Sequence, residues 1–327
     1  MNDPVRIVFH GANAASFTGE FASMLDVPAT LAVLPDALDT AADRNTFAAA
    51  QVIVGTSFDA TMPRPDRLLL YHLPAAGHDG IDQSALPPGA VLCNCFGHEG
   101  AIAEYVMAAL LRRTVPLEDA DRQLRQGAWP YWAGAPERAH PELAGSTIGL
   151  LGFGHIGRAV AARARAFGMR VHVANRSPVA VGSTVDRYYA WNELDAFWGS
   201  ADVVIVTVPL VPDTRGLVGA SALAAMRPDA LLVNVARGPV VDEQALFEAL
   251  RDRRIGGAAI DTWYVYPPPD GTPTLPSALP FHTLSNVLMT PHMSGWTMGT
   301  IRRRQEAMAR NIGRRLRGQA CENVVGS

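Results

Sequence analysis

The stretch Thr147-Ile-Gly-Leu-Leu-Gly-Phe-Gly-His-Ile-Gly157 decides the fold, because it joins a strand pattern to a helix pattern through three glycines. Residues 147–151 predict a buried strand, and the alanine-rich segment Arg158–Phe167 predicts a helix. In this G-x-G-x-x-G spacing, the first glycine allows a tight turn, the second lets a pyrophosphate approach, and the third lets helix and strand pack. A second strand candidate follows at Arg170–Ala174. The stretch therefore predicts a dinucleotide-binding βαβ unit, and the alternative is a glycine turn that binds no ligand.

The residues after that second strand indicate which dinucleotide would bind. In units that bind NAD, an acid about 20 residues beyond the glycines holds the ribose hydroxyls. This chain has Asn175, Arg176 and Ser177 there, and all three side chains can donate to a 2′-phosphate that an acid would repel. We therefore expect a preference for NADP over NAD. The alternative is that Arg176 is only an exposed strand-end residue and that NAD binds with less selectivity.

Outside this unit, short apolar runs alternate with longer helical patterns through most of the chain. Strand candidates before the glycine turn are Val5–Phe9, Val52–Gly55, Leu68–Tyr71 and Val91–Cys93, and later ones are Asp202–Val208, Ala230–Asn234, Ala258–Ile260 and Val287–Thr290. This alternation predicts an α/β fold, with parallel sheets covered by helices on both faces. Residues Ser146 to Thr290 would form a doubly wound nucleotide domain.

Three other segments have a clear local pattern. Apolar residues fall on one face from Glu99 to Leu111, which predicts a helix. Pro267 to Pro280 contains six prolines and predicts a loop. A last helix from about Thr297 to Leu316 carries a row of arginines, which we interpret as a solvated helix face rather than an anion site: Arg302, Arg303, Arg304, Arg310, Arg314 and Arg315.

Composition narrows the class of protein. The 327 residues suit two domains, and 48% hydrophobic with 18% charged residues allows a filled interior. The net charge of -3 argues against nucleic acid or an anionic membrane as the main partner. No segment approaches the ~18 apolar residues that span a bilayer, and Val5–Phe9 indicates a first strand rather than a signal peptide. Cys93, Cys95 and Cys321 form no disulfide framework and no zinc pattern, so we expect no metal and a cytoplasmic location.

Four further motifs occur in order along the chain: Ala201-Asp-Val-Val-Ile-Val-Thr-Val-Pro-Leu-Val-Pro-Asp-Thr214, Val233-Asn-Val-Ala-Arg-Gly-Pro-Val-Val-Asp-Glu243, Gly257-Ala-Ala-Ile-Asp261 and Thr290-Pro-His292. With the glycine turn, they resemble the D-2-hydroxyacid dehydrogenases, whose superfamily also holds formate and phosphite dehydrogenases. The likeness covers nearly the whole chain and is strongest from Glu142 to Gly295.

The resemblance implies a Rossmann-type doubly wound parallel sheet that is inserted into a flavodoxin-like substrate domain, with the active site in the cleft. The substrate domain would comprise residues 1–98 and 294–327, and the dinucleotide-binding domain residues 99–293. Members of the family are usually dimers through the nucleotide domain, so we expect a homodimer.

The same resemblance implies two catalytic residues. Arg237 matches the arginine that grips the substrate carboxylate and carbonyl, a task that suits a planar guanidinium. The alternative for Arg237 is a residue that caps the local backbone. His292 matches the acid/base that exchanges a proton with the carbonyl oxygen, and an imidazole suits that exchange near neutral pH.

Binding residues follow from the resemblance as well. Asp261 would approach the nicotinamide carboxamide, and Val208 and Pro209 would form a wall beside the adenine. The loop around Ala76 and Gly77 would hold the substrate carboxylate through its N–H groups. The remaining positions expected to contact the cofactor are Gly152, Phe153, Gly154, His155, Ile156, Gly157, Thr214, Val235, Ala236, His292 and Gly295.

One position departs from the family pattern. Relatives carry a glutamate five residues after the aspartate, where it pairs with the histidine, but this chain has Tyr266. A tyrosine can hydrogen-bond an imidazole but brings no negative charge, so one cause of a raised histidine pKa is absent and His292 should be neutral over more of the physiological range. Asp270 is the closest acid in that segment. Formate dehydrogenases also lack the glutamate and have glutamine there, and their reaction needs no acid/base step because its product is carbon dioxide.

Two interpretations of this departure stay open: another group supports His292, or the chemistry needs less proton transfer. His98 and Glu99 could supply an imidazole and a carboxylate to the site. The alternative is an ordinary helix start, with Glu99 favourable to the helix dipole and His98 solvated.

These observations lead to one functional hypothesis and two alternatives. The main hypothesis is an NADPH-linked 2-oxo acid reductase, which is a D-2-hydroxyacid dehydrogenase in the reverse direction, acting on a small anionic substrate. Tyr266 motivates the first alternative, a formate- or phosphite-type dehydrogenase. The second alternative is a dinucleotide-sensing regulatory protein without turnover, against which the joint presence of Arg237 and His292 argues.

Overall fold

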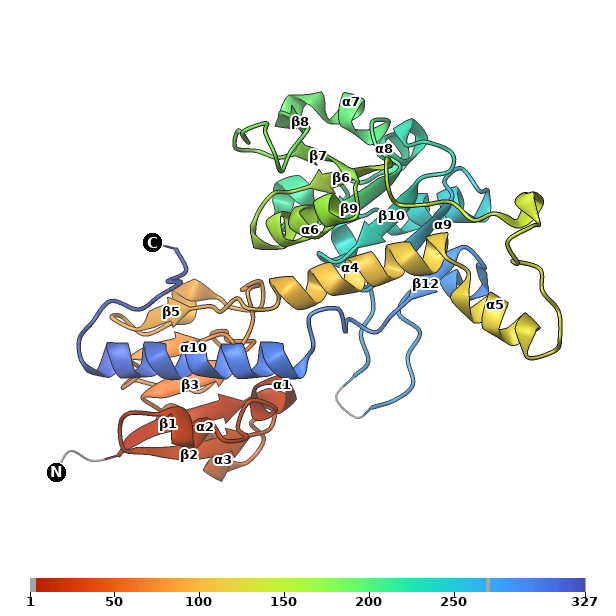
Figure 1. Ribbon diagram of the computed structural model, residues 1–327. Coiled ribbons are helices and arrows are strands. Elements are labelled where there is room, and N and C mark those ends of the chain that lie inside the picture. The colour runs from red at the N-terminus through yellow and green to blue at the C-terminus, as the bar shows by residue number, and fades with distance from the viewer. Residues whose placement is uncertain (1–3, 269–270, 327) are drawn as a thin grey trace. The chain divides into compact units, whose positions relative to one another are not determined.

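The structure is a computed structural model that describes residues 4–268 and 271–326 (Figure 1). The chain divides into two compact units. The first unit is Met1–Gly97 with Thr297–Ser327, and the second unit is His98–Trp296. That the first unit binds substrate and the second binds the dinucleotide stays a prediction.

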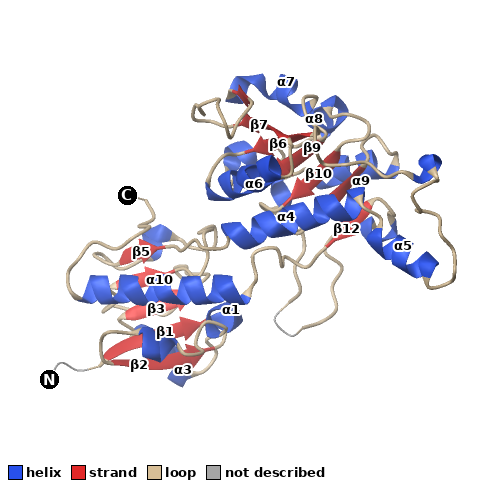
Figure 2. Cartoon of the chain, viewed as in Figure 1, coloured by secondary structure: helices blue, strands red, loops and turns tan. Residues whose placement is uncertain are grey.

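The second unit is built on a parallel sheet (Figure 2). Its strands are β6 (Thr147–Leu151), β7 (Arg170–Ala174), β8 (Arg187–Tyr189), β9 (Val203–Val206), β10 (Leu231–Asn234), β11 (Gly257–Ile260) and β12 (Val287–Met289). Over the described residues, the seven strands lie in the order β12-β11-β10-β9-β6-β7-β8, and each neighbouring pair is parallel. The chain order reverses between β6 and β9, which makes the sheet doubly wound.

Helices cover both faces of this sheet. They are α4 (Glu99–Thr114), α6 (His155–Ala166), α7 (Leu194–Trp198), α8 (Ala220–Ala225) and α9 (Glu243–Arg251), and a further helix, α5 (Leu117–Leu124), follows α4. Ile148 and Leu150 of β6 pack in one apolar cluster with α4 and α6. Leu151 packs in a second cluster with α7, α8 and α9. Since side chains alternate along a strand, β6 presents apolar residues to both layers, which is why its sequence is an unbroken apolar run.

The first unit contains the other sheet and the last helix. Its strands are β1 (Val5–His10), β2 (Ala29–Leu34), β3 (Val52–Gly55), β4 (Leu70–His72) and β5 (Val91–Cys93), and its helices are α1 (Gly11–Ala15), α2 (Phe21–Met24), α3 (Ala41–Ala48) and α10 (Met298–Leu316). Within the described ranges, the five strands lie in the parallel order β2-β1-β3-β4-β5, which is flavodoxin-like. Met308 and Ile312 of α10 share an apolar cluster with strands β1 and β3. The predicted fold class is therefore confirmed.

Short 3-10 turns join these elements. They are η1 (Gln83–Ala85), η2 (Pro136–Arg138), η3 (Trp191–Glu193), η4 (Pro212–Thr214), η5 (Gly238–Val240) and η6 (Phe281–Thr283). The described residues of the proline-rich segment 267–280 form neither helix nor strand, as the sequence predicts, while Pro269 and Asp270 lie outside the described residues.

The arginine row of α10 differs from the sequence-based interpretation. Arg304 was expected on a solvated face, but it is 9% exposed. Arg315 donates from Nε to the Leu69 carbonyl at 2.9 Å and from Nη2 to the Gly89 carbonyl at 2.7 Å. The interpretation is wrong for Arg304, which is buried, and Arg315 is only partly solvated because it bonds carbonyl groups of the segments that precede β4 and β5.

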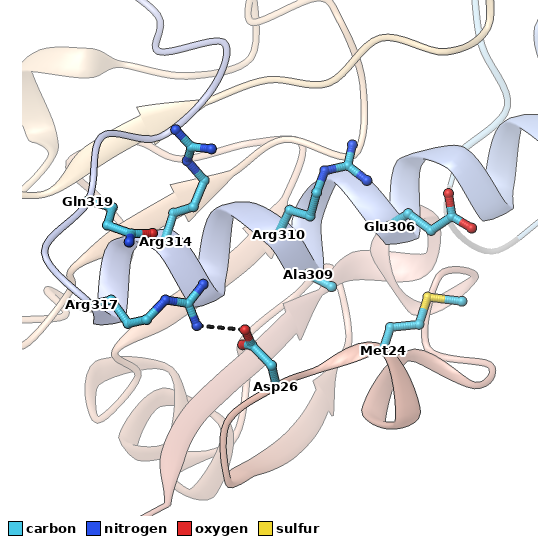
Figure 3. Close-up of a pocket in the computed structure, with 8 residues that line it drawn as sticks. All are labelled: Met24, Asp26, Glu306, Ala309, Arg310, Arg314, Arg317 and Gln319. Atoms are coloured by element: carbon cyan, nitrogen blue, oxygen red, sulfur yellow. Dashed lines mark hydrogen bonds and ion pairs between the residues drawn. The ribbon is translucent and has the colours of Figure 1, made fainter.

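The exposed end of α10 borders a surface cavity of 390 Å³ in the first unit (Figure 3). Its lining residues are Met24, Asp26, Glu306, Ala309, Arg310, Arg314, Arg317 and Gln319. Arg317 points toward Asp26, and its Nη1 lies 2.6 Å from Oδ2 of that carboxylate. None of the residues that the sequence assigns to a site lines this cavity.

A buried polar network joins β4, α10 and the C-terminal segment. His72 is fully buried, with Nδ1 at 3.0 Å from the Leu73 carbonyl and Nε2 at 3.0 Å from Nδ2 of Asn311. A carbonyl oxygen only accepts, so Nδ1 carries the proton and Nε2 accepts from Asn311. Asn311 also bonds both backbone groups of Glu322, at 2.9 and 2.8 Å. Burial lowers the pKa of His72 to about 4.

This network makes the stability of the protein dependent on pH. The unfolded chain binds a proton at His72 near pH 6.5, whereas the folded protein binds it only near pH 4, so stability is complete above pH 6.5 and is lost as the pH falls toward 4. The expected loss from His72 is about 3 kcal/mol in the free energy of unfolding at pH 4. Urea unfolding at pH 7.5, 5.5 and 4.5 measures it.

The matched variant is His72→Gln, which keeps a donor and an acceptor but does not titrate. Its free energy of unfolding should fall less with decreasing pH than that of the wild type. His10, whose pKa burial also lowers, contributes equally to both proteins. Identical pH dependence in the two proteins would show that His72 is not a source of the acid sensitivity.

Candidate active site

The predicted site residues of the second unit lie directly past the carboxyl ends of its strands. Residues 152–157 follow β6, 175–177 follow β7, 208–214 follow β9, 235–237 follow β10, Asp261 follows β11 and His292 follows β12. Because the strands are parallel, these segments share one edge of the sheet, and that edge includes the reversal of chain order between β6 and β9. Open α/β sheets bind ligands at this place.

The glycine turn has the geometry that a pyrophosphate requires. Gly152 has φ of +98°, a conformation that residues with a side chain rarely adopt. A Cβ at Gly157 would overlap the Gly152 carbonyl, whereas a Cβ at Gly154 would meet no described heavy atom within 4 Å. Gly154 is the N-cap of α6, and as a glycine it has no side chain that could cap the helix. The open backbone at Gly154 and the first N–H groups of α6 therefore fit a bound phosphate group.

Asn175 is engaged within the protein. Its Oδ1 accepts from the Phe153 N–H at 3.1 Å, and its Nδ2 donates to the Ser177 carbonyl at 2.8 Å. The side chain thus connects the end of β7 to the glycine turn after β6. The structure assigns Asn175 a part in shaping the turn, and a direct bond from it to a 2′-phosphate stays a prediction.

Arg176, in contrast, presents its guanidinium at the surface. The side chain is 61% exposed, and its carbon Cζ lies 5.7 Å from the centre of the Trp191 ring. Nη2 lies 3.2 Å from Oδ2 of Asp213, a residue of η4. An exposed guanidinium beside the end of β7 can reach a phosphate on the ribose of a bound dinucleotide.

The segment after β9 forms a fixed wall beside the glycine turn. Val208 is buried, and a Cβ at Gly152 would lie 3.0 Å from its Cγ1. Thr214 donates to the Pro209 carbonyl at 2.6 Å and accepts from the Val211 N–H at 2.9 Å. The Thr214 hydroxyl therefore holds the loop 209–214 in shape, and its predicted contact with the cofactor stays a prediction.

Arg237 follows β10 in a segment that Asn234 organises. Asn234 is buried, its Oδ1 accepts from the Ala236 N–H at 3.1 Å, and its Nδ2 donates to the Arg237 carbonyl at 3.1 Å. Val235 and Ala236 are buried, whereas the Arg237 side chain is half-buried and donates to the Ala236 carbonyl at 2.9 Å. Sequence reasoning missed the role of Asn234, although a polar residue at the end of an apolar strand is a signal that could have found it.

His292 and Tyr266 form a pair. The Tyr266 hydroxyl lies 2.8 Å from Nδ1 of His292 and accepts from the Trp263 N–H at 3.3 Å. The hydroxyl can donate to Nδ1 when the imidazole is neutral and accept from it when the ring is charged. The residue that replaces the family glutamate therefore occupies the position of a histidine partner, without a negative charge.

Asp261 fixes the loop that carries His292. The carboxylate is fully buried and accepts from the Thr290 hydroxyl at 2.6 Å and from the N–H groups of Met293 and Ser294, both at 2.9 Å. These bonds hold residues 290–294, in which His292 has φ of +58°. Oδ2 takes only the Ser294 bond among the described contacts, so it retains a free lone pair for the predicted bond to a carboxamide.

Tyr105 of α4 supports the same loop. Its hydroxyl lies 2.7 Å from Oγ1 of Thr290, and since Thr290 donates to Asp261, Tyr105 donates to Thr290. Burial, more than the nearby charge of Asp261, raises the pKa of Tyr105. Sequence reasoning missed both Tyr105 and Thr290 as supporting residues, because the two are far apart in sequence.

His98 lies beside this loop as well. It is the N-cap of α4 and is 9% exposed. A Cβ at Gly295 would lie 3.4 Å from Cβ of His98 and 3.4 Å from Cγ1 of Ile102. Nδ1 of His98 is 3.9 Å from Oε1 of Glu99. The structure thus brings His98 next to the residues that follow His292, and its catalytic role stays a prediction.

The predicted carboxylate-binding loop belongs to the first unit and follows β4. The Ala75 carbonyl accepts from the Cys95 N–H at 3.0 Å, and the Ala76 carbonyl accepts from Nδ2 of Asn94 at 2.7 Å. Within residues 4–268 and 271–326, no hydrogen bond uses the N–H groups of Ala76 and Gly77. The loop therefore has two amide donors that a carboxylate can use.

The described residues form neither a cluster of metal-binding side chains nor a helix that could span a membrane. No group of three or more His, Cys, Asp or Glu side chains among them could hold a metal ion. None of their helices combines the length and apolar character needed to cross a bilayer.

Comparison with known proteins supports the family suggested by the motifs. The family described as D-isomer specific 2-hydroxyacid dehydrogenase, NAD binding domain, matches residues 106–294. A glycerate dehydrogenase of Methylorubrum extorquens is 35% identical over 72% of this chain and 72% of its own length. A D-3-phosphoglycerate dehydrogenase of Methanocaldococcus jannaschii is 33% identical over 80% of this chain, and a glyoxylate reductase of Thermofilum pendens is 34% identical over 67%. The aligned part spans only 48% and 62% of those two relatives.

Solved structures agree over the whole chain. A D-isomer specific 2-hydroxyacid dehydrogenase family protein from Aeromonas salmonicida has a TM-score of 0.80 at 25% identity and covers 99% of both chains. An NADPH-dependent glyoxylate/hydroxypyruvate reductase from Sinorhizobium meliloti, in complex with NADP and malonate, has a TM-score of 0.77 at 26% identity and covers 99% of this chain and 97% of its own. The matched family, the site geometry and these structures lead to one conclusion: the chain belongs to the D-isomer specific 2-hydroxyacid dehydrogenase family.

Proposed function

We propose that this chain is a 2-oxo acid reductase that prefers NADP, and that it acts as a D-2-hydroxyacid dehydrogenase in the reverse direction. The observation that carries the proposal is the single sheet edge that holds the open glycine turn, Arg237 and the His292–Tyr266 pair. The family consists of NAD(P)-dependent oxidoreductases that act on CH-OH groups. Relatives named glyoxylate reductase and glycerate dehydrogenase support a small acid as the substrate.

Arg237, His292 and Asp261 have different roles in the proposed reaction. The Arg237 guanidinium pairs with the substrate carboxylate and polarises the neighbouring carbonyl, and charge-assisted bonds of this kind contribute roughly 1.5–3 kcal/mol each. A bound nicotinamide supplies the hydride that adds to the carbonyl carbon. His292 donates a proton from Nε2 to the carbonyl oxygen as negative charge develops there. Asp261 keeps His292 in place by holding residues 290–294.

The Tyr266 hydroxyl can form a hydrogen bond with Nδ1 of His292 in both protonation states of the imidazole. In the charged imidazole, Nδ1–H donates to the Tyr266 oxygen, and after Nε2 has given its proton to the product this bond can persist. Because a neutral hydroxyl stabilises the charged ring less than a carboxylate would, the proton-donating form should be present over a narrower pH range than in relatives with a glutamate.

A panel of substrates tests the proposal. Oxidation of NADPH, and separately of NADH, is followed with glyoxylate, hydroxypyruvate, pyruvate and phenylpyruvate, and reduction of NAD and NADP is followed with formate and phosphite. The proposal expects turnover of at least one 2-oxo acid, with a higher kcat/KM for NADPH. Turnover of formate or phosphite alone, or tight NADPH binding without any turnover, would contradict it.

The replacement Tyr266→Glu should extend activity to higher pH. A carboxylate next to Nδ1 favours the charged imidazole, so the alkaline limb of the pH–rate profile for 2-oxo acid reduction should move upward by about one pH unit. The profile of kcat/KM between pH 5 and 10 measures this. Tyr266→Gln keeps the hydrogen bond without the charge and should leave the limb in place; an equal upward move in both variants would rule out the electrostatic explanation.

We also propose that the protein is a homodimer, as the family resemblance implies. The segment 117–132, which consists of α5 and the residues after it and is called the arm below, exposes large apolar side chains. Leu117 is 69% exposed, Leu124 49%, Trp129 67% and Trp132 60%. None of the described residues of α5 is buried. A second copy that covers this arm would remove the apolar surface from water.

The double replacement of Leu117 and Leu124 by glutamate should dissociate the dimer. Light scattering after gel filtration is expected to give twice the chain mass of 35.0 kDa for the wild type and the chain mass for the variant. The control is Val181→Glu, which replaces another exposed apolar residue (61%) of the second unit and should leave the dimer intact. A monomeric wild type would contradict the proposal.

A further inference from the structure

Asp213, from a distant part of the chain, brings a carboxylate to the guanidinium of Arg176, the arginine that follows β7. The sequence has no acid after β7, where NAD-binding units carry one. Asp213, which lies in η4 beyond β9, approaches the arginine that follows β7: its Oδ2 is 3.2 Å from Nη2 of Arg176. A carboxylate from another loop therefore pairs with the cation at this position, although the sequence has no acid directly after β7.

The loop that carries Asp213 is held independently of the ion pair. The hydroxyl of Thr214 bonds the carbonyl of Pro209 and the N–H of Val211, at 2.6 and 2.9 Å. The Asp213 side chain is 74% exposed and that of Arg176 is 61% exposed. Since the fold of the loop depends on Thr214, and exposed ion pairs add little to stability, the pair is not required for structure.

The neighbouring polar residue at the end of β7 is not an equivalent donor. Both polar atoms of the Asn175 side chain bond backbone groups, those of Phe153 and Ser177. Arg176 is therefore a cation at this position that can bind a ligand, and a phosphate bound to it would share the guanidinium with Asp213. A dianionic 2′-phosphate and the Asp213 carboxylate would compete for the same guanidinium, and the two anions would repel each other.

We propose that Asp213 is a specificity-determining residue that limits the preference for NADP by competing with the 2′-phosphate for Arg176. The inference rests on the proposed cofactor site. Removal of the Asp213 charge should strengthen binding of a nucleotide with a 2′-phosphate and leave binding of a nucleotide without one nearly unchanged. Removal of the Arg176 charge should have the opposite effect on the 2′-phosphate and leave Asp213 free to accept from ribose hydroxyls.

Calorimetry with two nucleotide fragments tests this without any turnover. The probes are adenosine 2′,5′-bisphosphate and adenosine 5′-monophosphate, titrated into the wild type, Asp213→Asn, Arg176→Gln and the double variant. The matched control is Asp229→Asn. Asp229 is also 74% exposed and lies 3.4 Å from an arginine, Arg227. It comes just before the amino end of β10, whereas the proposed cofactor site lies past the carboxyl ends of the strands. The full chain is used throughout.

In Asp213→Asn, the Kd of the bisphosphate should fall about five-fold, while the Kd of the monophosphate changes less than two-fold. In Arg176→Gln, the bisphosphate should bind about ten-fold more weakly, and the further change of Asp213 should then have less effect than in the wild type. Asp229→Asn should match the wild type.

The inference is overturned if Asp213→Asn leaves the ratio of the two Kd values unchanged or shifts it toward the monophosphate. This outcome is distinct from failure of the proposed NADP preference, which would appear as equal binding of the two fragments by the wild type. If the wild type binds the two fragments equally and Asp213→Asn strongly prefers the bisphosphate, the proposed NADP preference of the wild type is wrong. The same result would still support the role of Asp213.

Discussion

Replacement of Arg237 by lysine is expected to lower kcat/KM for 2-oxo acid reduction by about 10²–10³-fold, although the positive charge is kept. The planar guanidinium can bond a carboxylate through two nitrogens and a carbonyl oxygen at the same time, whereas an ammonium group is a point charge. Asn234 holds the backbone of residues 235–237 through its own side chain, so the loop should keep its shape in the variant. Steady-state kinetics with the best substrate of the panel measures the effect.

The control for this prediction is Arg251→Lys, because Arg251 is an exposed arginine at the end of α9 that pairs with Asp252. It should retain the kinetics of the wild type. The Kd of NADPH should be unchanged in Arg237→Lys, which separates loss of substrate binding from loss of cofactor binding. A decrease of less than about five-fold in kcat/KM would mean that Arg237 does not contact the substrate.

Replacement of His292 by asparagine is expected to lower kcat by about 10²–10⁴-fold. Asparagine is the suitable replacement because His292 has φ of +58°, and asparagine adopts this left-handed conformation more readily than most residues. The bonds from Asp261 to the backbone of residues 293 and 294 do not involve the imidazole, so the loop should persist. Single-turnover reduction with saturating substrate measures the chemical step.

His98→Asn is the matched comparison, since His98 lies beside the same loop. If His292 is the proton donor, the loss in His98→Asn should be at least ten-fold smaller than in His292→Asn. A larger loss of activity in His98→Asn than in His292→Asn would assign the acid/base role to His98. A small loss in both variants would favour chemistry that needs no proton donor.

The central strands and the glycine turn could be predicted from the sequence because burial on both faces leaves a continuous apolar run. β6 and β7 have the predicted bounds, Thr147–Leu151 and Arg170–Ala174. β2 and β8 were missed, and both are edge strands. β8 has only three residues and begins with an exposed arginine, so it lacks the apolar pattern of a central strand. The sequence of β2 is a largely apolar run, Ala29–Leu34, although most of its residues are only partly buried or exposed, and its apolar pattern does not explain why it was missed.

The site could be predicted as a set of positions but not as a set of contacts. Motif order placed Arg237, Asp261 and His292 after successive strands. The contacts depend on how the loops fold at the sheet edge. Asp261 bonds three groups that are 29 to 33 residues away, and Asp213 pairs with Arg176 across 37 residues. Arg304 was misjudged for a similar reason, because a row of arginines along a helix does not reveal which of these side chains are buried in the fold.

Transfer of deuterium from labelled NADPH to a 2-oxo acid tests the central claim most directly. NADPH deuterated at C4 of the nicotinamide is incubated with the protein and hydroxypyruvate, pyruvate or phenylpyruvate, and the product is analysed by chiral chromatography with mass spectrometry. The account predicts a 2-hydroxy acid of D configuration with one deuterium at C2, and its formation should depend on Arg237 and His292. A product of L configuration, or no deuterated 2-hydroxy acid with any of the three substrates, would contradict it.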